Sequence, residues 1–468
     1  MVITKTAKLK ITSHTDIFND TIDIYNSALS FYIDVVNKEF DNLLFLTHSK
    51  EKMMYIESIT HRTASNIDIK YDFSINFYKF PSYLRRSVIN EALGVVSSHY
   101  SREKLYSEEK EKALTKGKKF LKKPPTLNLN HESFPVFYKG NMYKDTTLGK
   151  SEIKVFKNND LVLIDIKYKI KDLINRFDDC YQAINPTLIK KGKKYFLHIP
   201  FQTKVNLNST PLNNQKVIGV DLGLTNSAVC SCIDSNGTVI DRLFINQSKE
   251  KDQIKTISNK LSKAKRISGT KGEKPNYWRK INGLQKYIVQ NTVDEIVAFA
   301  VKNNADVIVF EHLGKMKLPK GVFGAKRFRA KLHNWAKQRI QEKTIQKAWS
   351  NGIRNSKILA NGTSKFAFDG SGLVQRNSKK DLAKFQNNKI YNADLSASYN
   401  IASRYFTRAI LKPLSEKIRL QIEANVPLIA DRTSHTLSSL IRLQEVINHV
   451  NNTSVSSIYD KETLSIII

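Results

Sequence analysis

The sequence has no long apolar segment. No stretch of its 468 residues reaches the roughly 18 consecutive apolar residues that a membrane-spanning helix needs, which argues against a helical membrane protein and against a membrane partner. The first residues, MVITKTAKLKITSHTD, also lack the apolar core of a signal peptide. We therefore expect a soluble protein that stays in the cytoplasm.

Cysteine is scarce, since the chain has only Cys180, Cys230 and Cys232. Three thiols cannot complete a four-cysteine zinc site, and the last two are spaced as strand neighbours rather than as a C-x-x-C pair. A cytoplasmic protein also keeps its thiols reduced, so no disulfide framework is expected. We interpret all three as packing residues.

Acidic residues are few relative to basic ones. The chain carries 43 Asp and Glu against 76 Lys and Arg, a formal net charge of +33, and its pI is about 9.8. Such an excess repels itself unless a polyanion neutralises it, so nucleic acid is the leading partner. An anionic membrane surface is the lesser alternative, because the sequence lacks a long basic amphipathic helix with a continuous apolar face.

The first half of the chain combines one strand, a helical segment and a β-rich segment. Residues 3–11 alternate polar and apolar as in a half-buried strand, and apolar residues then recur at helical spacing. We place a first strand at residues 1–14, a helical insertion at 15–120 and a β-rich, barrel-like domain at 121–210. The first strand is expected to join the later sheet.

The second half has a different pattern. From Val217 onward, buried-looking strands alternate with amphipathic helices, which is typical of an α/β domain and which we place at residues 211–405. Residues 406–468 are expected to be a mostly helical extension, to which the sequence assigns no role. The chain is therefore predicted to be an α+β protein of several domains, as its length suggests.

Three acidic residues stand at the ends of apolar elements. Asp221 ends the apolar run VIGVD, Glu311 ends VIVFE, and Asp394 lies in the first turn of a predicted helix in NADLSASYNIA. Charges seldom occupy such places unless they bind something. Each residue alone could instead be a helix cap or a strand-end carboxylate paired with a lysine. Together, in a basic chain, the three indicate a metal-binding catalytic site.

Carboxylates of this kind suit one reaction in particular. Hydrolysis of a phosphodiester needs an activated water and a stabilised leaving oxygen, and two Mg²⁺ ions supply both. Mg²⁺ prefers oxygen ligands such as those of Asp and Glu. We therefore expect two Mg²⁺ ions as cofactors and a nucleic acid as substrate.

The blocks GVDLGLTN, VIVFEHL and NADLSASYNIA resemble, in order and spacing, the three RuvC motifs of TnpB, the transposon-encoded RNA-guided nuclease, and of the related type V CRISPR effectors. The resemblance covers about residues 215–405. Residues 1–210 resemble that family only in layout, although LIKKGKKYFLHIPF is similar to the stretch that usually precedes the first motif.

The resemblance implies a function. It implies an RNase H-like (RuvC) α/β domain, preceded by a β-barrel-like wedge domain with a helical recognition insertion, in a prokaryotic protein. It implies an Mg²⁺-dependent DNA endonuclease in which Asp221, Glu311 and Asp394 bind the metal. A guide RNA would select double-stranded target DNA by base pairing, and the protein would read a short motif beside the target.

The sequence departs from the family in one segment, the loading-loop insert at about residues 355–391. The family usually has a zinc knuckle there, in which a Thr-Ser pair precedes the first cysteines. In this chain Thr363 and Ser364 are followed by Ala367 and Gly370 at the cysteine positions, and FQNNKIYN has no cysteine pair. No zinc is therefore expected, and we hypothesise that Phe366 and Phe368 pack in its place.

Basic residues interleaved with aromatic ones predict nucleic-acid contacts. Trp278 and Tyr287 lie in one such stretch, although Trp278 could instead anchor a helix to the core. The helical insertion is where we expect the adjacent motif to be read. The residues predicted to bind nucleic acid are Arg85, Arg86, Arg102, Arg279, Arg327 and Arg329. Arg376 could assist the scissile phosphate or could be a solvated loop residue.

Two alternatives remain. The chain could be a cleavage-deficient RNA-guided repressor, or an unguided RNase H-fold transposase or junction nuclease. The sequence does not define the guide RNA, the adjacent motif, the type of locus or the oligomeric state.

Overall fold

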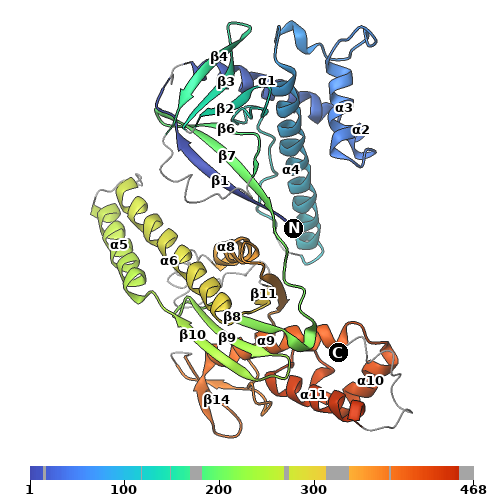
Figure 1. Cartoon of the computed structure of the whole chain (residues 1–468), viewed down its shortest axis with the longest axis vertical. Coiled ribbons are helices and arrows are strands. Elements are labelled where there is room, and N and C mark those ends of the chain that lie inside the picture. The colour runs from blue at the N-terminus through green and yellow to red at the C-terminus, as the bar shows by residue number, and fades with distance from the viewer. Residues whose placement is uncertain are drawn as a thin grey trace. The chain divides into compact units, whose positions relative to one another are not determined.

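The computed structural model describes residues 1–13, 17–117, 119–147, 149–168, 182–267, 274–312, 337–378 and 381–452. The chain forms two compact mixed α/β units, one consisting of Val2–Lys204 and the other of Met1 with Val205–Ile468 (Figure 1). Within the described ranges, no helix is both long and apolar enough to cross a membrane.

In the first unit, the helices come after the first strand in the sequence and before the strand that pairs with it. Its elements are β1 (Val2–Lys10), α1 (Phe18–Lys38), α2 (Phe40–Leu44), α3 (Ser49–Thr60), η1 (Phe73–Ile75), α4 (Ser82–Leu114), β2 (Tyr143–Thr147), β3 (Lys150–Lys157), β4 (Asp160–Lys167), β5 (Gln182–Ala183), β6 (Thr187–Lys191) and β7 (Lys194–Lys204). As expected, β1 joins the later sheet, where it pairs antiparallel with β7 from Val2 opposite Lys204 to Lys10 opposite Phe196. β5 and β6 also pair with β7, and β2, β3 and β4 form a second sheet.

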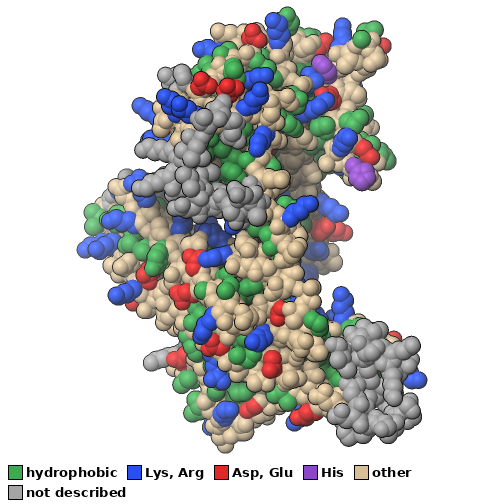
Figure 2. Space-filling model, in the orientation of Figure 1, with side chains coloured by type: hydrophobic (Ala, Val, Ile, Leu, Met, Phe, Trp, Pro, Cys, Tyr) green, Lys and Arg blue, Asp and Glu red, His purple; other side chains and the backbone are tan. Residues whose placement is uncertain are grey.

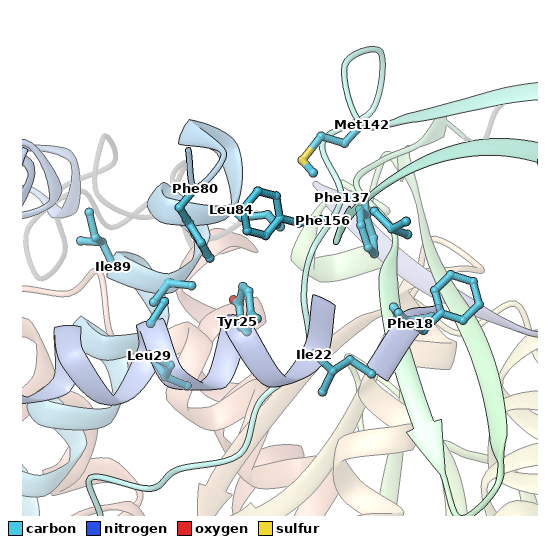
Figure 3. Close-up of a cluster of buried hydrophobic side chains, with 14 of the residues drawn as sticks. Phe18, Ile22, Tyr25, Leu29, Phe80, Leu84, Ile89, Phe137, Met142 and Phe156 are labelled. Carbon is cyan, nitrogen blue, oxygen red and sulfur yellow. The ribbon is translucent and has the colours of Figure 1, made fainter. Parts of the chain in front are cut away.

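One apolar core joins the helices and strands of this unit. The residues of α1 that face inward recur every three or four positions, so one side of the helix is apolar. Figure 3 shows part of the core, with Phe18, Ile22, Tyr25, Leu29, Phe80, Leu84, Ile89, Phe137, Met142 and Phe156 labelled. The buried Thr21 hydroxyl donates to the Phe156 carbonyl at 2.9 Å. The helical insertion therefore shares its core with the strands rather than forming a core of its own.

The second unit is built on a five-stranded sheet. Its elements are η2 (Leu212–Asn214), β8 (Lys216–Asp221), β9 (Ala228–Asp234), β10 (Val239–Ile245), α5 (Ser248–Ile267), α6 (Pro275–Lys302), β11 (Val307–His312), α8 (Lys337–Trp349), β12 (Arg354–Leu359), β13 (Gln375–Arg376), β14 (Leu382–Lys384), β15 (Ile390–Asn392), α9 (Ala393–Leu411), α10 (Glu416–Asn425), η3 (Pro427–Ile429) and α11 (Leu437–Asn452). The strand order is β10-β9-β8-β11-β12. β9 is antiparallel to β8 and β10, whereas β11 is parallel to β8 and β12.

Both faces of this sheet are covered, which explains why its central strands are apolar throughout. Val217 of β8 and Val309 of β11 face a core shared with α9, α10 and α11. Ile218 and Phe310, their chain neighbours, face a core shared with α6 and α8. Gly219 allows α9 to lie directly on β8, because a Cβ there would be 2.2 Å from the Ser398 carbonyl oxygen.

The C-terminal helices belong to the same core as α9. Ile418, Ile422, Leu440 and Leu443 are buried in it, and all four come from the segment expected to be a mostly helical extension. The expected boundary at residue 405 falls inside α9, which continues to Leu411. The helix continues because its apolar face is packed over that whole length.

The segment between β12 and α9 has a small aromatic cluster of its own. The Phe368 ring lies 5.6 Å from that of Phe385, 4.9 Å from that of Tyr391 and 5.1 Å from that of Tyr399. Strands β13, β14 and β15 form a small antiparallel sheet beside it. Phe368 thus packs among other aromatic rings, whereas Phe366 makes a backbone bridge to Leu373; that the two side chains take the place of a zinc site stays a prediction.

Candidate active site

Asp221 and Glu311 lie at the same edge of the sheet. The parallel strands β8 and β11 pair from Val217 opposite Val307 to Val220 opposite Phe310, so the next residue of each strand is the carboxylate. Neighbouring strands are about 4.8 Å apart, and both side chains come at the carboxyl ends of their strands. The register therefore places these two carboxylates next to each other.

Asp394 reaches this edge from α9. The helix begins with Asn392 as its cap, whose side chain accepts from the Leu395 amide at 2.9 Å. The carboxylate of Asp394 lies against the turn that follows β8, since a Cβ on Gly223 would be 3.6 Å from its Oδ2 atom. The Asn226 side chain in the same turn hydrogen-bonds to it. Residues from three separate sequence blocks thus lie near the same edge of the sheet.

The electrostatics of the three carboxylates are unfavourable. Burial, and after it the charges of Glu311 and Asp394, raise the pKa of Asp221 to about 8, against the opposing effects of Lys337 and Arg376. Burial also raises the pKa of Asp394, whereas Arg376 and Asn226 lower it. A site that concentrates negative charge in this way is suited to a cation.

Glu311 is held by three neighbours. The Thr363 hydroxyl donates to its Oε1 atom at 2.5 Å, and the Lys337 ammonium lies 3.6 Å from its Oε2 atom. The Gln341 side chain donates to its backbone carbonyl at 3.0 Å. Sequence reasoning named Thr363 only as part of a motif and missed Lys337 and Gln341. No local pattern marks them, because they contact Glu311 only through the tertiary fold.

The donor chemistry fits Mg²⁺, which takes carboxylate oxygens. Across the described ranges, however, no three His, Cys, Asp or Glu side chains are gathered closely enough to hold one metal ion as they stand. Asp221 and Glu311 instead lie near the ammonium of Lys337, whose pKa burial lowers and the two carboxylates raise. The residues that would hold Mg²⁺ are therefore adjacent but not drawn around a common point.

Arg376 lies beside the carboxylates. Its guanidinium is exposed on β13 and donates to the Ser364 carbonyl at 3.3 Å. Its charge lowers the pKa of both Asp221 and Asp394. An exposed arginine at the rim of the site is available to a phosphate, and its role in phosphate binding stays a prediction.

The other predicted nucleic-acid contacts differ in exposure. Arg85 does not lie on an exposed basic face, since it is 6% exposed and donates to Glu57 at 2.9 Å. The reason is that Arg85 lies on the buried face of α4, where its charge is paired with Glu57. Arg86 and Arg102 are exposed, and Arg86 also pairs with Glu57 at 3.4 Å.

On α6, Arg279 is exposed, and so is Trp278, whose ring lies under the Lys265 ammonium at 5.8 Å rather than in the core. Tyr287 is exposed as well. Arg327 and Arg329 lie outside the described residues. On the face drawn in Figure 2, Lys and Arg side chains are spread over the surface of each unit, with Asp and Glu side chains scattered among them.

The comparisons with known proteins give partial matches. The sequence model of the Aq_aa04 family matches residues 3–157, about a third of the chain and none of the carboxylate site. A search of curated protein sequences finds no match.

Several solved structures align with most of the chain. A Cas12f1–sgRNA–target DNA complex has 16% identity over 86% of this chain and 99% of that chain, with a TM-score of 0.31. The mini-RNA-guided endonuclease CRISPR-Cas_phi3 has 12% identity over 85% and 92%, with a TM-score of 0.42. C2c1 of Alicyclobacillus acidoterrestris in complex with single-guide RNA has 8% identity over 84% and 69%, with a TM-score of 0.38. These TM-scores are all below 0.5 and do not establish the function of this chain.

Proposed function

We propose that the chain is an RNA-guided DNA endonuclease related to TnpB and the type V CRISPR effectors. The observation that carries the proposal is that Asp221, Glu311 and Asp394 lie near one another at one edge of a five-stranded sheet. In this proposal the sheet with the order β10-β9-β8-β11-β12, and with α9 against β8, is the core of an RNase H-like (RuvC) domain. The sequence blocks that hold the three carboxylates are those that resemble the RuvC motifs.

In this proposal the three carboxylates bind two Mg²⁺ ions through their oxygen atoms. When bound, the metal supplies an activated water and stabilises the leaving oxygen of the phosphodiester. Asp221 and Glu311, on rigid neighbouring strands, fix the position of their oxygens, and Asp394 adds a ligand from the helix. Arg376, exposed near the carboxylates, would pair with a backbone phosphate.

The first unit would be the wedge domain with its recognition insertion. Its nine-residue pairing between β1 and β7 brings the start of the chain and the end of the unit into one sheet. The excess positive charge of the chain suits a guide RNA and double-stranded target DNA as partners. Base pairing would select the target, and the protein would recognise a short adjacent motif, in the cytoplasm of a prokaryotic cell.

The first experiment is a cleavage assay. The protein is co-expressed with RNA from its own locus and given a plasmid library with randomised flanks in Mg²⁺, beside an Asp221→Ala control. Cutting next to one short motif that disappears in the control supports the proposal. RNA that co-purifies with a protein that binds DNA without cutting it indicates the repressor, and RNA-independent cutting indicates a transposase or junction nuclease.

A further inference from the structure

The two carboxylate oxygens of Glu311 have different partners. Oε1 accepts a hydrogen bond of 2.5 Å from the Thr363 hydroxyl, and Oε2 lies 3.6 Å from the Lys337 ammonium. A hydroxyl donor fixes direction as well as distance, whereas an ammonium on a flexible stem does so much less. Thr363 therefore determines the orientation of the carboxylate more than Lys337 does.

Thr363 is itself held rigidly. Its side chain is in the interior, with the residue 1% exposed, and its carbonyl accepts from the buried Asn400 amide at 3.0 Å. The same amide donates to the Phe366 carbonyl at 2.9 Å, so Asn400 spans the turn. Gly362 precedes Thr363 with a φ of +86°, and a Cβ there would be 2.0 Å from the Thr433 carbonyl oxygen. The turn that presents Thr363 thus requires glycine.

The C-terminal part of the second unit supports this turn. The Leu437 amide donates to the Asn400 side-chain oxygen at 3.2 Å. One helical turn further along α9, the Arg404 guanidinium donates to the carbonyls of Leu359 and Asn361 at 2.9 and 2.7 Å. The same guanidinium donates to the carbonyls of Thr433 and His435 at 2.5 and 3.0 Å. Two side chains of α9 therefore tie the Thr363 turn to residues 433–437.

We propose that Thr363 is a positioning residue for Glu311, which rests on the proposed function. Its hydroxyl holds Oε1 and so leaves Oε2 facing the Lys337 ammonium; with metal bound, Oε2 would be the oxygen that takes part in binding it. A metal ion would displace the ammonium but leave the Thr363 hydrogen bond in place. Removing a group that orients a metal ligand typically weakens metal binding by about 10- to 100-fold.

A purely structural role for Thr363 is the competing explanation. The same hydroxyl lies 3.0 Å from the Ala360 carbonyl, and its single proton serves one acceptor best. If the Ala360 contact dominates, removal of the hydroxyl lowers stability without changing the metal affinity. Metal binding measured directly separates the two roles.

The test measures Mn²⁺ binding to the purified full chain by calorimetry, with the binding to Asp221→Ala subtracted as background. Thr363→Val should weaken Mn²⁺ binding by about tenfold, while Thr363→Ser, which keeps the hydroxyl, should stay close to the wild type. Thr407→Val is the matched control, since it removes another buried hydroxyl of the second unit that bonds to a backbone carbonyl. It should leave Mn²⁺ binding unchanged.

Two results would overturn the inference: Thr363→Val binding Mn²⁺ as tightly as the wild type, or Thr363→Ser losing as much affinity as Thr363→Val. If thermal unfolding shows that Thr363→Val does not fold, Thr363→Ala is measured and judged in the same way. A wild type that binds no more Mn²⁺ than Asp221→Ala contradicts the proposed function instead. The Mg²⁺ concentration for half-maximal cleavage should rise for Thr363→Val in parallel with the binding constant.

Discussion

Replacing Asp221 with asparagine should stabilise the metal-free protein. The pKa of this partly buried carboxyl is raised from 3.8 to about 8, first by its removal from water and then by Glu311 and Asp394. Between those two pH values the folded protein binds a proton that the unfolded protein releases. The free energy of unfolding therefore falls as pH rises from about 4 to 8. Below about pH 4 the carboxyl is protonated in both states and does not destabilise the protein.

The magnitude follows from the same two pKa values. Each pH unit between them contributes about 1.4 kcal/mol, so the ionisable carboxyl lowers the free energy of unfolding by an amount on the order of 4 kcal/mol at pH 7. Asparagine has a similar size and does not titrate. The stability difference between Asp221→Asn and the wild type should therefore be small at pH 4.5 and grow to several kcal/mol by pH 8, from the same linkage.

Urea unfolding in EDTA, followed by tryptophan fluorescence, measures this difference. The three tryptophans, Trp278, Trp335 and Trp349, all belong to the second unit, so the signal reports on the unit that contains the site. Asp252→Asn, at an exposed position of α5, is the matched control and should show no pH-dependent gain. Added Mg²⁺ should stabilise the wild type but not Asp221→Asn.

One result would refute the reasoning: a stability difference between Asp221→Asn and the wild type that stays constant from pH 4.5 to pH 8 in EDTA. Such a result would mean that neither burial nor the charges of Glu311 and Asp394 raise the pKa of Asp221 in the folded protein. Loss of stability in Asp221→Asn at every pH would point instead to a structural role for the carboxylate.

Two further substitutions test the packing and the ion pairs of the two units. Gly219→Ala should lower the free energy of unfolding by about 3 kcal/mol and reduce cleavage, because its Cβ would displace the helix that carries Asp394. Gly283→Ala, in open space on α6, is the control and should leave stability unchanged or raise it slightly. Equal effects of the two substitutions in urea unfolding would contradict the close contact at Gly219. Glu57→Ala should cost about 3 kcal/mol because it leaves Arg85 buried without its partner, whereas Glu108→Ala on an exposed pair should cost under about 0.5 kcal/mol. Circular dichroism during urea unfolding measures the second comparison, and a loss at Glu57 no larger than that at Glu108 would show that Arg85 remains solvated.

The elements that carry the carboxylates could be predicted because their signals are local. The apolar runs before Asp221 and Glu311 are typical of strands covered on both faces, and Asn392 and Asp394 are typical of the start of a helix. The adjacency of the first two carboxylates depends on the parallel register of β8 and β11, which no local pattern encodes. The common setting of the three carboxylates at the ends of apolar elements, together with the resemblance to RuvC motifs, suggested it in advance.

The contacts around Glu311 could not be predicted, because they arise from tertiary packing. Thr363 and Lys337 reach the carboxylate from a turn and a helix that follow β11 in the chain, and their residue types are common at exposed positions too. Arg85 shows the opposite error. An arginine among Leu and Val on an amphipathic helix suggests an exposed basic face, but its position faces Glu57 in the interior.

The tie between α9 and residues 433–437 has a consequence for biosynthesis. A ribosome makes the strands with Asp221 and Glu311 first, and the segment that supports the Thr363 turn is among the last parts of the site to be synthesised. While the chain is still being translated, Asn400 and Arg404 lack these partners, so the turn is incomplete. We expect the Thr363 turn of the nascent chain to form only after residue 437 has left the ribosomal tunnel; under the proposed function, an unfinished chain would then not cut DNA.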